Sequence, residues 1–281
     1  MPTAVLLLSC PDRPGLVHAV ADFVLSVSGN IVHAEQHIDV ESGVFFQRVE
    51  FEAPGLDAAA LTAAFAPVAQ RFGMSVRART TDERPRVAVL ASTQPHCLGD
   101  LLARWRSGEL PAEIVVVISN HEDHERLAAF HAVPFRHLPV TPETREAQEA
   151  ALLEVLRRHD VELVVLARYM QVLGRRVLDA YPSQIINIHH SFLPAFVGAR
   201  PYHQAQQRGV KLVGATAHYA TVDLDEGPII AQDVAPVSHR DSVADLVRKG
   251  RDLETVVLAR AVRAHVEHRT LVFGNKTIVF G

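Results

Sequence analysis

Short aliphatic runs without polar alternation recur through the last two thirds of the chain, and they constrain the fold more than any other feature. Helical stretches are expected near 98–106, 122–131 and 142–158, the last with Thr141-Pro142 at its start. Strands that are apolar on both sides and alternate with helices are typical of a parallel sheet covered on both faces. The sequence therefore predicts an open, mostly parallel, Rossmann-like α/β domain. The runs are 87–91 (VAVLA), 114–118 (IVVVI), 162–166 (ELVVL) and 184–188 (QIINI).

The C-terminal part continues this pattern with weaker signals. Residues 211–236 are expected to form one or two further strands, followed by a helix over about 242–266. The final stretch, 270–280, is apolar on both sides of Gly274-Asn275, a dipeptide that favours a hairpin turn.

The N-terminal part has a different order of elements: strand, helix, strand, strand, helix, strand. This order is typical of the split βαβ, ferredoxin-like unit. The first helix is expected to start with Asp12 as N-cap and Pro14 in its first turn. The polar stretch 80–86 (TTDERPR) is the best candidate boundary, so we expect domains at 1–82 and 83–281. The remaining elements are expected at 4–9 (strand), 31–39 and 44–52 (hairpin), 57–72 (helix) and 74–80 (strand).

Composition excludes several classes of protein. The formal net charge of −4 gives no sign of a basic groove, so nucleic acid is not expected as the main partner. The two cysteines, Cys10 and Cys97, lie far apart and suggest neither a disulfide framework nor a metal-type pair, in keeping with a reducing cytoplasm. The first apolar run lacks a basic region before it and is expected to be a strand rather than a signal peptide. No stretch approaches the roughly 18 apolar residues of a membrane helix, so no membrane partner is expected.

The stretch 185–196 (IINIHHSFLPAF) places polar side chains at the end of a predicted parallel strand, where ligands of open α/β sheets bind. Because strand side chains alternate, Asn187 and His189 should point one way and His190 the other. A metal site is disfavoured, since no further carboxylate or thiol lies at ligand spacing. Two readings remain open: an acid–base site, or polar residues satisfied at a strand end.

Two motifs resemble the formyltransferase family that uses 10-formyltetrahydrofolate. The first comprises Asn187, His189, Ser191, Leu193 and Pro194; the second comprises His218, Leu224, Asp225, Gly227 and Pro228. The resemblance implies that Asn187, His189 and Asp225 form the catalytic set, with His218 in a supporting role. The chemistry agrees, since Asn187 and His189 could stabilise an oxyanion and Asp225 could accept a proton or orient the imidazole. Without the first motif, Asp225 would read as a turn carboxylate and His218 as a core histidine.

The same resemblance suggests a folate pocket along 163–174 (LVVLARYMQVLG). In the family this segment binds the substrate largely through backbone groups and apolar side chains. Plain core packing is the alternative reading. The expected substrate-binding residues are Arg168, Met170, Gln171, Val172, Leu173 and His218.

The loop 92–104 bears on which nucleophile accepts the formyl group. Glycinamide ribonucleotide formyltransferases resemble this domain and hold the acceptor's phosphate in a glycine- and serine-rich loop. Here Pro95 removes a backbone donor and Gly99 falls inside the presumed helix, so the loop suits phosphate poorly. Water then becomes the expected nucleophile. Formylation of transfer RNA is disfavoured by the charge and by the lack of an appended basic domain.

The N-terminal unit resembles an ACT domain, through Asp12-Arg13-Pro14-Gly15 and Gly29-Asn30. Such domains bind small ligands, often amino acids, and commonly pair across subunits. The expected regulatory residues are Asp12, Arg13, Pro14, Gly15 and Asn30. An ACT domain before a formyltransferase domain is the arrangement of 10-formyltetrahydrofolate deformylases.

That resemblance implies hydrolysis of 10-formyltetrahydrofolate to formate and tetrahydrofolate, which supplies formate for processes such as purine synthesis. No cofactor and no metal are expected, and a cytoplasmic homodimer or homotetramer with an amino-acid effector is implied. Two alternatives stay open: formyl transfer to an amine such as glycinamide ribonucleotide, and a folate-binding regulator without turnover.

Overall fold

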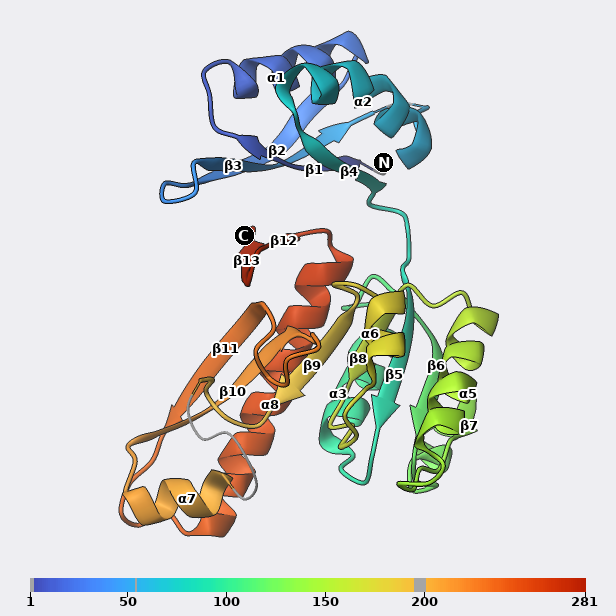
Figure 1. Ribbon diagram of the computed structural model, residues 1–281, viewed down its shortest axis with the longest axis vertical. Helices are drawn as coiled ribbons and strands as arrows, with labels where there is room; N and C mark the ends of the chain where they lie inside the picture. The colour runs from blue at the N-terminus through green and yellow to red at the C-terminus, as the bar shows by residue number, and fades with distance from the viewer. Residues whose placement is uncertain (1–2, 54, 195–200) are drawn as a thin grey trace. The chain divides into compact units, whose positions relative to one another are not determined.

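The computed structural model of the protein describes residues 3–53, 55–194 and 201–281 (Figure 1). Residue contacts divide the chain into two compact units. Unit 1 comprises Met1–Glu83 with Glu267–Leu271 and Ile278–Gly281, and unit 2 comprises Arg84–Val266 with Val272–Thr277. Among the described residues, no helix has the length and apolarity needed to cross a bilayer.

Unit 1 has the predicted ferredoxin-like arrangement. Its described strands form an antiparallel sheet in the order β2-β3-β1-β4, and both helices lie on one side of it (Figure 1). Its core includes a T-shaped contact between Phe23 and Phe65, whose ring centroids are 4.8 Å apart. The elements are β1 (Ala4–Pro11), α1 (Leu16–Ser26), β2 (Asn30–Asp39), β3 (Val44–Glu52), α2 (Ala58–Phe72) and β4 (Ser75–Thr80).

The first helix starts later than predicted, and Asp12 is not its N-cap. Helix α1 follows Gly15, whose φ of 93° lies in the left-handed region and turns the chain into the helix. Pro14 lies in the turn before it. The backbone N–H of Asp12 instead donates to the carbonyl oxygen of Gly43 at 2.8 Å, which ties this residue to the hairpin between β2 and β3.

Unit 2 is the predicted open α/β layer structure. Within the described residues its sheet has the order β11-β10-β9-β8-β5-β6-β7, and β5 to β9 are mutually parallel. The antiparallel strands β10 and β11 extend it beyond β9. Its strands are β5 (Arg86–Ala91), β6 (Glu113–Ser119), β7 (Phe135–His137), β8 (Leu163–Leu166), β9 (Ile185–His189), β10 (Leu212–Tyr219) and β11 (Ile229–Pro236).

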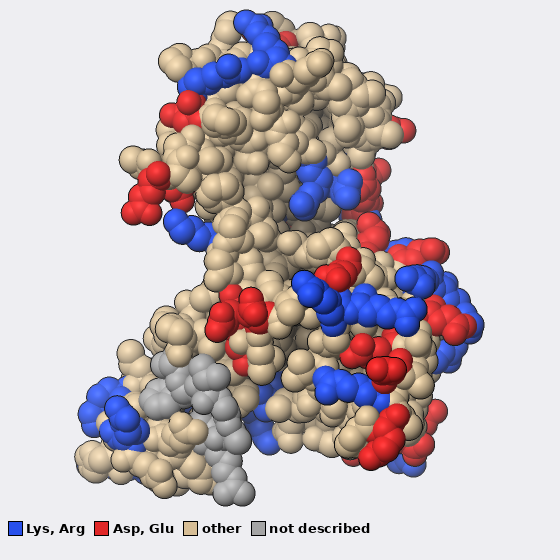
Figure 2. Space-filling view, viewed as in Figure 1, with Lys and Arg blue, Asp and Glu red and all other residues tan. Residues whose placement is uncertain are grey.

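Helices cover both faces of this sheet, which explains the unbroken apolar runs. Val89 of β5 packs into a core with residues of α3 and α8, whereas its neighbour Leu90 packs into a second core with residues of α5. Figure 2 shows acidic and basic side chains mixed together on the visible face of the molecule. The helices are α3 (His96–Arg106), α4 (Glu125–Phe130), α5 (Arg145–Arg158), α6 (Arg175–Ala180), α7 (Pro201–Arg208) and α8 (Val243–Val266).

The start of α5 differs from the prediction, whereas the C-terminal hairpin agrees with it. Helix α5 begins at Arg145 after Thr144, so Thr141-Pro142 is not its start. The Thr141 backbone N–H donates to Thr144 Oγ1 at 2.9 Å, which closes a turn before the helix. The predicted C-terminal hairpin is confirmed as β12 (Thr270–Phe273) and β13 (Lys276–Val279), joined through Gly274 at a φ of 56°.

Candidate active site

Strand pairing brings Asn187 and His218 together. Strands β9 and β10 are antiparallel, and their register places Asn187 opposite His218. Asn187 Nδ2 lies 3.2 Å from His218 Nε2, while His218 Nδ1 lies 3.0 Å from the carbonyl oxygen of Tyr219. A carbonyl oxygen only accepts, so Nδ1–H donates to Tyr219 and Nε2 accepts from Asn187. The Asn187 amide keeps a second hydrogen for another acceptor.

Asp225 joins both histidines from the loop between β10 and β11. Its Oδ2 lies 3.2 Å from His189 Nδ1, and its Oδ1 lies 3.6 Å from His218 Nε2. The hydrogen bond from His189 and the nearby His218 ring hold the pKa of the Asp225 carboxyl well below its usual range, against the effect of burial. Asp225 is therefore ionised at any physiological pH.

His189 is held by one ring nitrogen only. Its side chain is 7% exposed and its Nδ1–H donates to Asp225. Its Nε2 is buried and has no hydrogen-bond partner among the residues that the structure describes. A buried polar atom without a partner is costly, so a fixed ring with a free nitrogen indicates a position prepared for a substrate atom.

The loop that carries Asp225 is shaped by a close backbone approach. A Cβ at Gly227 would lie 1.8 Å from the carbonyl oxygen of Tyr219, so only glycine fits there. The Tyr219 backbone N–H donates to the Pro228 carbonyl oxygen at 2.9 Å and fixes the loop to β10. Asp225 has a φ of 59°, a region that ordinary side chains seldom occupy. The surrounding contacts thus hold Asp225 against its backbone preference.

These polar residues line a pocket of about 530 Å³. Besides Asn187, His189 and Asp225, its walls come from the loop after β8 and the loop after β10. Ser92 Oγ accepts a hydrogen bond from the Met170 backbone N–H at 3.0 Å, which anchors the first loop at the end of β5. The structure places all six predicted substrate-binding residues in the lining: Arg168, Met170, Gln171, Val172, Leu173 and His218.

Comparisons with known proteins agree with this geometry. The formyl transferase family model matches residues 85–262. A formyltetrahydrofolate deformylase of Synechocystis is 53% identical over 99% of this chain and 98% of its own length. The crystal structure of a formyltetrahydrofolate deformylase from Pseudomonas syringae superimposes with a TM-score of 0.98 at 49% identity, covering 100% of this chain and 95% of that one.

The chain belongs to the formyl transferase family, among the formyltetrahydrofolate deformylases. A glycinamide ribonucleotide transformylase from Symbiobacterium toebii is more distant, with a TM-score of 0.67 at 36% identity and coverage of only 70% of this chain. The similarity to deformylases therefore includes the N-terminal unit.

One side chain of this deformylase-family site lies where strand alternation did not predict it. His190 was expected to face away from Asn187 and His189, but it lines the same pocket. Strand β9 ends at His189, so alternation no longer governs the next residue. The rings of His189 and His190 lie side by side, with centroids 5.1 Å apart.

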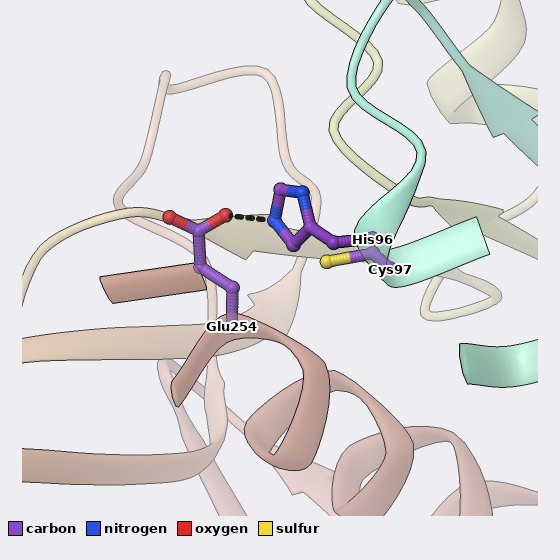
Figure 3. A group of neighbouring side chains, drawn as sticks. All are labelled: His96, Cys97 and Glu254. Atoms are coloured by element: carbon purple, nitrogen blue, oxygen red, sulfur yellow. Dashed lines mark hydrogen bonds and ion pairs between the residues drawn. The ribbon is translucent and has the colours of Figure 1, made fainter. Parts of the chain in front are cut away.

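A second polar group, which no sequence motif predicted, lies next to the pocket. Glu254 of α8 is 2% exposed, and its Oε2 lies 2.7 Å from His96 Nε2 (Figure 3) and 3.4 Å from Arg168 Nε. Tyr202 donates its hydroxyl hydrogen to Glu254 Oε1 at 3.1 Å. Burial alone would raise the pKa of Glu254, but His96 and Arg168 outweigh it and lower the pKa. In the sequence Glu254 is simply one acidic residue in a helix.

This group includes ligand types that metals use, yet it is organised as an ion pair. One ligand atom each from His96, Cys97 and Glu254 lies within 4.8 Å of the others. However, burial raises the pKa of the Cys97 thiol, and the neighbouring Glu254 raises it further. The thiol stays protonated, while the Arg168 guanidinium already supplies the positive charge beside Glu254. These residues fit a cation poorly.

The predicted regulatory residues lie at the surface of unit 1. Asp12, Arg13, Pro14 and Gly15 are exposed between β1 and α1, and Asn30 is exposed at the start of β2. Arg13 donates to the carbonyl oxygen of Arg71 at 2.7 Å and lies over the Phe72 ring.

Proposed function

We propose that this protein hydrolyses 10-formyltetrahydrofolate to formate and tetrahydrofolate, as a hydrolase of a linear amide C–N bond. The observation that carries the proposal is His189, which is fixed through Nδ1 to Asp225 and presents a free Nε2 in the pocket. Two relatives named formyltetrahydrofolate deformylase support the same reaction. They are 53% and 49% identical to this chain and match nearly its full length.

The pocket suits a folate. Its lining joins polar atoms at the strand ends to aliphatic side chains of two loops, and Met170, Val172 and Leu224 are more than half exposed there. A flat heteroaromatic ring binds well in an apolar slot that has polar groups at its edge. The formyl group of a folate bound in this slot would reach Asn187 and His189.

Hydrolysis then proceeds by addition of water to the formyl carbon. The second amide hydrogen of Asn187 and a protonated His189 Nε2 stabilise the negative charge that forms on the formyl oxygen, and each such donor is worth about 10²- to 10³-fold in rate. Asp225 assists water activation through its charge and by keeping His189 in the required orientation. The C–N10 bond breaks as N10 takes up a proton, which yields formate, tetrahydrofolate and one released proton.

Isotope-labelled water tests this reaction directly. Incubation of the protein with 10-formyltetrahydrofolate in H₂¹⁸O, without any amine, should yield formate that carries one ¹⁸O from the solvent and an equal amount of tetrahydrofolate. His189→Ala should lose this activity, whereas His239→Ala, an exposed histidine before α8, should keep it. Release of formyl groups only in the presence of an added amine would contradict hydrolysis and favour formyl transfer.

We further propose that residues 1–82 form an ACT regulatory domain and residues 83–281 the catalytic domain. The βαββαβ order of unit 1 supports the ACT assignment, with an amino acid as effector near Asp12, Arg13, Pro14, Gly15 and Asn30. The reaction as written needs no cofactor, and we place it in the cytoplasm with the protein as a homodimer or homotetramer. Thermal unfolding with each amino acid, together with sedimentation, tests the effector and the assembly.

A further inference from the structure

We propose that His190 is a further catalytic residue, which accepts the proton of the water that attacks the formyl carbon. This inference rests on the proposed hydrolysis and assigns its proton acceptor. His190 is not part of the two family motifs, and strand alternation predicted that it would face away from Asn187 and His189.

His190 has the position that such a role requires. It follows β9 directly and lines the pocket beside His189, with ring centroids 5.1 Å apart and planes tilted by 31°. The Tyr202 ring lies farther off, at 6.3 Å between centroids. Within the described residues neither ring nitrogen of His190 has a hydrogen-bond partner, so the ring is free to bind a water in the pocket.

The other candidate acceptors are already engaged. Both Asp225 oxygens face histidine nitrogens, so neither oxygen is left to accept a proton from a water in the pocket. His189 uses Nδ1 for Asp225, and its Nε2 is needed as a donor to the oxyanion. His218 uses both ring nitrogens, one for Tyr219 and one for Asn187. His190 is thus the pocket imidazole with an uncommitted lone pair.

Burial of the His190 ring keeps that lone pair available. Burial lowers the pKa of His190 to about 4, with further lowering by Arg168 and His189 and partial opposition from Glu254 and Asp225. A neutral imidazole carries one acceptor nitrogen, which an imidazolium lacks. At neutral pH His190 therefore accepts a hydrogen bond from water instead of donating one.

Arg168 is held in this position by the ion pair described above. It has a left-handed φ of 62°, and its Nε lies 3.4 Å from Glu254 Oε2. Glu254 is in turn fixed by His96 and Tyr202. Because Arg168 lines the same pocket as His190, this ion pair fixes a positive charge beside the histidine.

A bond forms between the water oxygen and the formyl carbon while one water proton moves to His190, which becomes an imidazolium. The tetrahedral adduct then expels N10, and the proton on His190 returns through the pocket to N10. Formic acid loses its remaining acidic proton to solvent and leaves as formate. No oxidant, reductant or metal takes part.

Chemical rescue tests the proposal. In His190→Ala we expect kcat for formate release to fall about 10²- to 10⁴-fold, with KM changed little. Free imidazole should then restore activity at least about tenfold, since it supplies the missing base in the vacated space. His239→Ala, the matched surface control, should keep wild-type kcat and show no response to imidazole.

A second variant covers the case in which His190→Ala fails to fold. His190→Gln preserves a hydrogen-bonding side chain but has no basic nitrogen, so kcat should fall by a similar factor while KM is kept. Near-wild-type kcat in either folded variant, or a lower kcat in His190→Ala that imidazole does not restore, would overturn the assignment. Failure of the wild-type protein to release formate would instead overturn the proposed function itself.

Discussion

Asp225 contacts two histidines from a loop position that its own backbone disfavours. Each carboxylate oxygen faces one imidazole: Oδ2 accepts from His189 Nδ1–H, and Oδ1 lies 3.6 Å from His218 Nε2. Loss of this charge removes the strong acceptor of His189 Nδ1–H and leaves the ring free to rotate. The pairing of β9 with β10 does not involve Asp225, so we expect its loss to change the site and not the sheet.

In Asp225→Asn we expect kcat for formate release to fall about 10²- to 10⁴-fold with an unchanged fold. Steady-state kinetics and circular dichroism measure the two effects. Asp223→Asn is the matched control, because Asp223 is an exposed carboxylate in the same loop. If Asp225→Asn kept near-wild-type kcat, Asp225 would have no part in the mechanism.

The role of Gly227 is steric: it allows the loop to approach the backbone of β10. A Cβ there would lie 1.8 Å from the Tyr219 carbonyl oxygen, so Gly227→Ala should force the loop away from β10. We expect a loss of about 1–3 kcal/mol in the free energy of unfolding, as for other overpacked sites, together with reduced kcat. Gly99→Ala is the contrasting control: its Cβ would meet no atom closer than 4.0 Å within α3, and alanine favours a helix. Equal unfolding energies for both variants would refute the steric account.

At the scale of elements, α8 links the core of unit 2 to the site. The helix spans 24 residues and packs along β9, β10 and β11. Its buried face is mainly apolar, with Val257, Leu258 and Val262 in the core, yet it also contains Glu254. A buried carboxylate in such a face is tolerated because three side chains from other elements surround it.

Glu254→Leu should therefore destabilise unit 2 by about 3–5 kcal/mol, because Arg168 is left buried without its partner. The folded-state pKa of Glu254 lies below its ordinary value of 4.5, so this stabilisation is present above pH 4.5 and is lost as pH falls through the folded pKa. Urea unfolding at neutral and acidic pH measures both effects. Asp252→Leu, an exposed acidic position on the same helix, should change stability by no more than about 0.5 kcal/mol.

At the scale of the whole molecule, each unit has its own core, and unit 1 includes the C-terminal end of the chain. Arg48 Nε donates to the carbonyl oxygen of His268 at 3.1 Å, and the Gly281 backbone N–H donates to Glu35 Oε2 at 2.8 Å. The N-terminal part of the chain and its C-terminal end therefore both contribute hydrogen bonds to unit 1.

His268 makes this unit sensitive to acid. Burial lowers the pKa of His268 to about 4 from 6.5, with further lowering by Arg79, Arg77 and Arg48. The unfolded chain binds this proton more readily, so unit 1 should lose up to about 3 kcal/mol as pH falls from 6.5 towards 4. Hydrogen exchange in β3 between pH 7 and 4 measures the loss. His268→Asn, which tolerates the local φ of 53°, should flatten the dependence; an equally steep response would exclude His268 as its source.

Much of the fold was predictable because hydrophobic patterns are local. Aliphatic runs located β5, β6, β8 and β9, and helical periodicity located α2, α3 and α8. Helix starts were less predictable. Asp12 and Thr141 are residue types that often cap helices, but the backbone N–H of Asp12 bonds to Gly43 and that of Thr141 bonds to the Thr144 side chain. The short elements β7, α6 and α7 have too few residues for a clear pattern.

The layer architecture, the strand end that carries Asn187 and His189, and the motif that contains Asp225 were all predictable from the order of residues. Periodicity and motif order are properties of neighbouring residues, so they can be read along the chain. By contrast, the folded chain was needed to show that His190 shares the pocket and that Glu254 of α8 contacts His96 and Arg168. These contacts join residues up to 158 positions apart, and their strength depends on burial and distance, which no local pattern encodes.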